Sequence, residues 1–263
     1  MAAEALDSNV EWKKWGQVDP LFGVSAWKGR GIGCPAPWTD AEFYDLGRRD
    51  WEQFAAHWEK YGFDRACCVE VGCGAGRITM QLADCFGKVH AIDVSEGMIE
   101  YARQRVRSPN VAFHLTNGMR IPVPQESATA VFSSHVFQHF DALSQASAYF
   151  AEITRVLKPG GTMMIHVPIH RWPAMPGVFG VLYSWRKAVG GSVAWLRRRL
   201  LERGLGRPIM RGLSYPVDYL FDTLPQMGLL NVEVWILSPE PSNRDPHPFV
   251  LARRAPTRAV VTR

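Results

Sequence analysis

Residues 69–77 contain three glycines at alternate positions directly after a short apolar run: Val69-Glu70-Val71-Gly72-Cys73-Gly74-Ala75-Gly76-Arg77. The apolar run predicts a buried strand, and the glycines permit the positive φ angles of a tight turn. A helix is expected to begin near Gly76. At such a junction the free backbone amides of the helix N-terminus favour an electronegative ligand. The spacing GxGxG departs from the GxGxxG of dinucleotide-binding enzymes, so the match to a nicotinamide enzyme is imperfect.

The sequence on either side of this turn alternates between strand and helix patterns. Apolar runs predict strands at 66–71, 88–94, 111–116, 128–134 and 162–168, with helices at 77–85, 96–106 and 143–157. Repeated strand–helix alternation indicates an α/β fold with a parallel sheet. A helix at 217–227 precedes two closing strands, 230–237 and 248–253, which a short connection should pair antiparallel. We predict a Rossmann-like seven-stranded sheet with helices on both faces and an antiparallel last strand.

Composition divides the chain into four parts. Residues 1–62 hold six of the ten tryptophans and are predicted to form an aromatic-rich cap, with a loop at 16–37 and a helix from about 41 to 61. The α/β core is expected at 63–169 and again at 215–263. Residues 170–214 interrupt it without a clear strand pattern, and we predict that they form a basic insertion.

An acid follows the glycine turn at the spacing that a nucleoside-binding fold requires. Asp93 ends the second predicted strand, 21 residues after Gly72. A carboxylate at this strand tip can accept hydrogen bonds from both ribose hydroxyls of an adenosine. The alternative is an ordinary strand-end acid beside a tight turn.

Three motifs in order give the chain its family resemblance. Residues 70–76 resemble the first motif of class I S-adenosylmethionine-dependent methyltransferases of the methyltransferase-domain-11 type. Residues 91–99, Ala-Ile-Asp-Val-Ser-Glu-Gly-Met-Ile, are similar to the family's second-strand motif. Residues 155–161, Arg-Val-Leu-Lys-Pro-Gly-Gly, resemble the signature before its fifth strand. The combination is specific for fold and cofactor and leaves the acceptor open.

The resemblance implies that S-adenosyl-L-methionine is the cofactor and assigns residues to its parts. Glu70 would lie near the methionine end, Asp93 would hold the ribose, and Val94 and Met98 would flank the adenine. Asn117 would accept a hydrogen bond from the adenine amino group, and its alternative is a turn residue ahead of Gly118. The predicted cofactor-binding set is Glu70, Gly72, Cys73, Gly74, Gly76, Arg77, Asp93, Val94, Met98, Asn117, Gly118 and Ser134.

Histidines supply the candidates for a general base. The sulfonium already activates the methyl group, so the protein must align the acceptor and remove a proton from a hydroxyl. Residues 133–140 resemble the S-x-x-x-L-Q-H segment of small-molecule members, and His135 and His139 share one face if this segment is helical. His170 follows the fifth strand. Each of the three is a catalytic candidate, with a packing or loop histidine as the alternative. Clustered histidines also suit a divalent metal, but no carboxylate pattern accompanies them, so we predict no metal site.

The predicted activity is therefore methyl transfer to a small molecule or saccharide, at a hydroxyl oxygen. Residues 12–23 look like the opening of bacterial methyltransferases that accompany polysaccharide-building enzymes. The alternatives are N-methylation of a small natural product, methylation of RNA, and a non-catalytic cofactor-binding protein. Against RNA stand the lack of a recognisable RNA-binding domain and of an Asn-Pro-Pro-Tyr-type motif after the fourth strand.

Positive charge concentrates in the insertion. The chain carries a formal +5, yet residues 171–211 contain nine arginines and lysines against the single acid Glu202. The basic insertion has three possible functions. It could form a lid whose arginines bind a phosphate or carboxylate of the acceptor, contact a membrane surface through 178–203, or bind nucleic acid. We favour the lid, expect an anionic or lipid-linked acceptor, and expect no nucleic acid.

The remaining sequence features bear on the cellular compartment of the protein. Residues 1–10 lack an apolar run typical of a signal peptide, and no stretch reaches the ~18 apolar residues of a membrane span. The five cysteines form no pair of CxxC elements, which argues against a zinc site of that type. Reduced thiols and no export signal predict a cytoplasmic protein.

Overall fold

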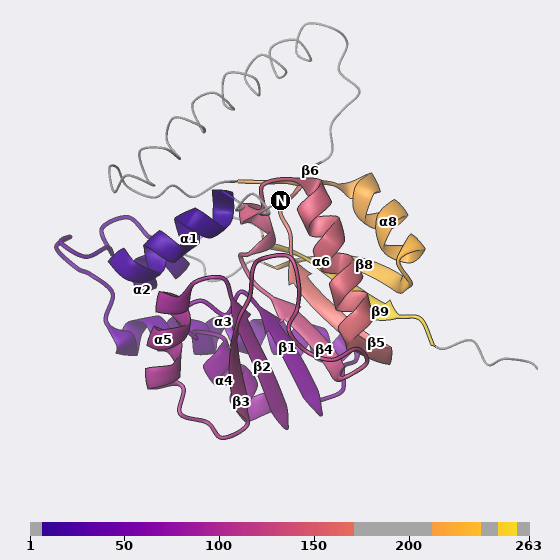
Figure 1. Cartoon of the computed structure of the whole chain (residues 1–263), viewed down its shortest axis with the longest axis horizontal. Helices are drawn as coiled ribbons and strands as arrows, with labels where there is room; N and C mark the ends of the chain where they lie inside the picture. The colour runs from indigo at the N-terminus through magenta and orange to yellow at the C-terminus, as the bar shows by residue number, and fades with distance from the viewer. Residues whose placement is uncertain (1–6, 171–211, 238–246, 257–263) are drawn as a thin grey trace, which may run out of the picture.

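The computed structural model describes residues 7–170, 212–237 and 247–256, and a seven-stranded sheet runs through them (Figure 1). The strand order is β3-β2-β1-β4-β5-β9-β8. The strands are β1 (Cys67–Val71), β2 (Lys88–Asp93), β3 (Val111–Leu115), β4 (Ala128–Ser133), β5 (Leu157–His166), β8 (Leu229–Leu237) and β9 (His247–Arg254). The first five are parallel, and β9 is antiparallel to both β5 and β8. The predicted fold class, including the antiparallel last strand, is confirmed.

Helices cover both faces of the sheet, which explains why β1 and β4 are buried along their whole length. On one face, α3 (Asp40–Tyr61) packs Trp51, Phe54 and Trp58 against Cys68 and Phe132. The flanking helices α4 (Thr79–Cys85) and α5 (Glu96–Arg105) contact β2 beside it. On the other face, α6 (Leu143–Val156) and α8 (Val217–Gln226) contribute Phe150, Leu220 and Leu224 to the larger core cluster.

The N-terminal residues differ from their prediction. The expected loop at 16–37 is wrong over its first part, because α1 (Asp7–Val18) runs into it and α2 (Pro20–Val24) follows. Asp19 explains the second helix: its carboxylate accepts a hydrogen bond from the Phe22 amide at 3.1 Å and one from the Ile32 amide at 2.6 Å. Pro20, with its preset φ, then occupies the first turn.

Two further boundaries were not foreseen. Residues 158–161, which were expected to separate the helix at 143–157 from the strand at 162–168, belong to β5, which begins at Leu157 and has a register shift against β4 between Ala128 and Ala130. A small parallel pair, β6 (Ile169–His170) and β7 (Tyr215–Pro216), joins the two ends of the basic insertion. Residues 171–211, which hold most of the predicted lid and the whole proposed membrane contact at 178–203, lie outside the described residues.

The described helices include none with both the length and the apolar character needed to cross a membrane.

Candidate active site

The glycine turn lies at the carboxyl end of β1, where backbone groups hold it closed. The amides of Gly72 and Cys73 both donate to the Ile92 carbonyl, at 2.8 and 2.9 Å. Gly72, Gly74 and Gly76 all have positive φ. A Cβ on Gly72 would stand 2.2 Å from Val136 Cγ2, so a larger residue has no room there. The turn therefore needs glycine at position 72 for both its backbone angle and its packing.

Asp93 ties this turn to the start of α5. Its Oδ2 accepts a hydrogen bond from the Gly74 amide at 2.8 Å, and its Oδ1 accepts one from the Ser95 amide at 2.9 Å. Burial raises the pKa of this carboxyl, while the backbone donors oppose that rise. Asp93 lines the cavity described below, so the same carboxylate both orders the turn and faces open space.

Glu70 is a buried acid in the middle of the core. It is 3% exposed, and Thr79 Oγ1 donates to its Oε2 at 2.6 Å. Burial raises the pKa of Glu70 to about 7, although the threonine hydrogen bond favours the charged form. Glu70 thus differs from a surface glutamate in being partly protonated at neutral pH.

A cavity of about 520 Å³ opens at this edge of the sheet. Its wall comes from α1, α2, the glycine turn, the ends of β2, β4 and β5, and the start of β9. Nine residues predicted for the site line it together: Gly72, Gly74, Arg77, Asp93, Val94, Gly118, Ser134, His135 and His139. The predicted residues Glu70, Cys73, Gly76 and Met98 are buried in the surrounding packing.

Asn117 makes the contacts of a turn residue, and its contact with the adenine amino group stays a prediction. Its Oδ1 accepts a hydrogen bond from the Met119 amide at 3.0 Å, and its backbone carbonyl accepts one from Asn9 Nδ2 at 2.8 Å. Its neighbours Thr116 and Gly118 line the cavity on either side.

His135 and His139 do not share a helical face, so that part of the sequence argument is wrong. His135 has φ +60°, in the left-handed region that an α-helix cannot include. A single 3₁₀ turn, η1 (Phe137–His139), follows it. Both imidazoles nevertheless line the cavity. His139 is 4.9 Å from Trp12 between ring centroids, and its Nε2 lies 2.9 Å from Gln138 Nε2.

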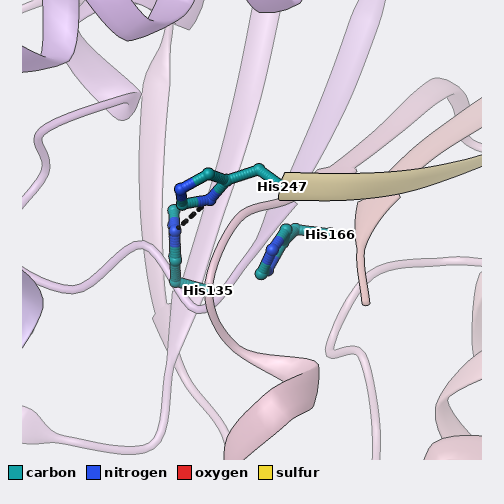
Figure 2. A group of neighbouring side chains, drawn as sticks. All are labelled: His135, His166 and His247. Atoms are coloured by element: carbon teal, nitrogen blue, oxygen red, sulfur yellow. Dashed lines mark hydrogen bonds between the residues drawn. The ribbon is translucent and has the colours of Figure 1, made fainter. Parts of the chain in front are cut away.

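His135 belongs to a group of three imidazoles that the sequence did not bring together (Figure 2). His135 Nε2 lies 2.9 Å from His247 Nδ1, and the His166 ring is 4.5 Å from the His135 ring between centroids. His166 ends β5 and His247 begins β9. Because β9 runs antiparallel to β5, its first residue reaches the carboxyl ends of the parallel strands. No local pattern marks His247, which is 112 positions from His135.

His170, the other predicted base, ends β6, where its backbone pairs with Pro216.

Asp50 is a second residue that sequence reasoning missed. It comes from α3 and forms an ion pair with Arg77, the two side chains being 12% and 7% exposed. Both line the cavity. The pair neutralises an arginine that would otherwise leave a buried positive charge beside the glycine turn. No local sequence pattern marks Asp50 as the partner of Arg77, because the two residues are 27 positions apart.

The comparisons with known proteins agree with this architecture. Residues 69–165 match the family model described as a methyltransferase domain. A malonyl-[acyl-carrier protein] O-methyltransferase of Hahella chejuensis is 36% identical over 98 residues, which are 36% of this chain and 34% of that protein. A demethylmenaquinone methyltransferase of Tropheryma whipplei is 31% identical over 122 residues, which are 42% of this chain and 47% of that protein. The chain thus spans less than half the length of these curated relatives.

A solved structure extends the likeness beyond the matched segment. Magnesium protoporphyrin IX methyltransferase from Synechocystis, with bound S-adenosylhomocysteine, superposes with a TM-score of 0.54 at 15% identity, over 84% of this chain and 90% of that one. At this identity the likeness establishes the fold. The family model matched over residues 69–165 and the sheet order together support a class I, S-adenosylmethionine-dependent methyltransferase.

Proposed function

We propose that this protein transfers the methyl group of S-adenosylmethionine to a hydroxyl oxygen of a small-molecule or saccharide acceptor. One observation carries the proposal: the glycine turn, Asp93 and the histidines open into a single cavity of about 520 Å³. That volume falls within the range of small-ligand and cofactor sites. The proposed cofactor contacts and the candidate bases therefore line one and the same cavity.

The residues of the turn suit the proposed cofactor. The Gly72 and Gly74 backbone forms part of the wall without side chains, so a ligand can approach it closely. Each carboxylate oxygen of Asp93 accepts one backbone hydrogen bond and retains a further acceptor site for a ribose hydroxyl. Val94 and Gly118 line the same space and would flank the adenine.

His139 is the base that the geometry favours. The Gln138 amide nitrogen can only donate, so the His139 Nε2 that it contacts at 2.9 Å is the unprotonated nitrogen. An acceptor hydroxyl that displaces this amide would meet a lone pair able to take its proton. His135 is the weaker candidate, since contacts with Ser134 Oγ and His247 Nδ1 use both of its ring nitrogens. The bound cofactor supplies the activated methyl group.

Two features support an oxygen acceptor with apolar surface. The activity named for the Hahella relative is O-methyl transfer. Trp12 and Trp27 line the cavity, and such rings offer flat apolar surface to an organic or saccharide ligand. The basic insertion remains our predicted contact for an anionic or lipid-linked group of the acceptor.

Calorimetric titration with S-adenosylhomocysteine tests the cofactor part. We expect saturable binding that Asp93→Ala abolishes and that Asp84→Ala, at an exposed acid on α4, leaves intact. Asp93→Asn keeps one carbonyl acceptor and should weaken binding less than alanine does. Transfer of a labelled methyl group to a panel of hydroxylated small molecules and saccharides tests the reaction. Absence of cofactor binding, or equal binding by Asp93→Ala, would refute the proposal.

A further inference from the structure

Three imidazoles converge at the acceptor side of the cavity. One ring nitrogen from each of His135, His166 and His247 lies within 4.8 Å of the other two. They come from the loop after β4, the last residue of β5 and the first residue of β9. All three line the cavity, and Figure 2 shows the three side chains next to one another, with the hydrogen bond between His135 and His247 dashed. Three separate strand ends therefore present the same ligand type to one point.

We propose that His135, His166 and His247 bind a divalent transition-metal ion, most favourably Zn²⁺, with its fourth coordination position open to the cavity. Three imidazoles with an open position are a recognised ligand set for Zn²⁺. A tetrahedral site with Zn–N bonds of about 2.0–2.1 Å separates its nitrogens by roughly 3.3 Å. The 2.9 Å pair would open by a few tenths of an ångström, and a nitrogen–nitrogen separation at the 4.8 Å limit would close by about 1.5 Å through rotation of the rings.

The outer contacts of His135 are those of a metal ligand. Metal-bound histidines commonly donate their second ring N–H to an oxygen, which sets the tautomer and the ring orientation. Ser134 Oγ lies 2.8 Å from His135 Nδ1. With Nδ1–H donating to that hydroxyl, Nε2 is left unprotonated and directed at His247. His135 also holds φ +60°, a conformation that costs a non-glycine residue energy and places this ring toward the group.

His166 supplies the second, independent observation. It is 3% exposed, and its Nδ1 has no hydrogen-bond partner among the described residues. A buried ring nitrogen without a partner is costly unless a water or an ion satisfies it. Its aromatic neighbours Phe249 and His247 pack at 5.3 Å between centroids and hold the ring in place.

A neighbouring ion pair reduces the positive charge beside the group. Arg77 lines the same cavity and is paired with Asp50, so it opposes a cation less than a free guanidinium would.

The test is Zn²⁺ binding by the untagged, metal-stripped full chain, measured by competition with a chromophoric chelator. We expect one ion per chain, and at least about 100-fold weaker binding in His166→Ala and in His247→Ala, beyond the range seen for outer contacts. Ser134→Ala should weaken binding by about tenfold. His114→Ala is the matched control: it removes one ring of the His90–His114 pair, whose nitrogens are also 2.9 Å apart but which no third histidine joins among the described residues.

Co²⁺ provides a readout that needs no variant. In the wild type we expect the intense visible bands of tetrahedral Co²⁺, and circular dichroism reports whether each variant is folded. A weak octahedral spectrum in the wild type overturns the proposal. So does His114→Ala weakening Zn²⁺ binding as much as His166→Ala. Neither result depends on methyl transfer, so this proposal and the proposed function can fail separately.

Discussion

The two ends of the cavity are built in different ways. At the cofactor end, the glycine turn and Asp93 lie within 25 positions of the chain and are joined by hydrogen bonds from backbone amides. At the histidine end, His135, His166 and His247 come from three separate places and meet through side chains. The first end depends on local backbone geometry, and the second depends on the order and direction of strands. Their functions should therefore be separable by substitution.

The sharpest separation is expected at His139. His139→Ala should lower the methyl-transfer rate by about 100- to 10,000-fold, because it removes the proposed base, while S-adenosylhomocysteine affinity stays unchanged. Single-turnover transfer and calorimetry measure the two quantities. His57→Ala is the control, since His57 lies on α3 against Trp235, 5.5 Å between ring centroids. A parallel loss of rate and cofactor affinity in His139→Ala would show that the proposed base and the cofactor end act as one unit.

Alanine substitutions at two glycines test how the cofactor end depends on close packing. Gly72→Ala adds a Cβ 2.2 Å from Val136 and also forces a positive φ, so unfolding free energy should fall by about 3–5 kcal/mol. Gly160→Ala shares the positive φ and has no neighbouring atom within 4 Å, so about 1–2 kcal/mol is expected. Urea unfolding gives both values. Equal losses would mean that backbone strain, rather than the close packing against the loop after β4, sets the requirement for glycine.

The smallest effect concerns pH. The pKa of Glu70 is raised to about 7 in the folded state, above its ordinary value of 4.5. The folded state therefore binds more protons between these values, and stability should fall by roughly 1–3 kcal/mol as pH rises from 4.5 to 7. Glu70→Gln should flatten this slope, whereas Glu100→Gln, at an exposed residue of α5, should not. Urea unfolding midpoints at several pH values measure this dependence of stability on pH. An unchanged slope in Glu70→Gln would mean that other groups cause it.

Much of the fold could be read before the structure was known. Apolar runs marked each strand of the large sheet, most clearly β1 and β4, which are buried along their whole length. The two N-terminal helices were harder, because Asp19 caps α2 through contacts with Phe22 and Ile32 that composition does not reveal. The start of β5 was also missed, since Lys158-Pro159-Gly160-Gly161 has the composition of a turn and becomes a strand by pairing with β4.

The amino-acid sequence alone determined the sheet, the glycine turn and the position of Asp93. Periodicity and turn chemistry act over a few residues, so they can be read directly from the chain. The partnership of Asp50 with Arg77 and of His247 with His135 came instead from the packing of α3 and from the antiparallel direction of β9. Such contacts join residues 27 and 112 positions apart, and the free energy that selects them belongs to the whole core rather than to any short segment.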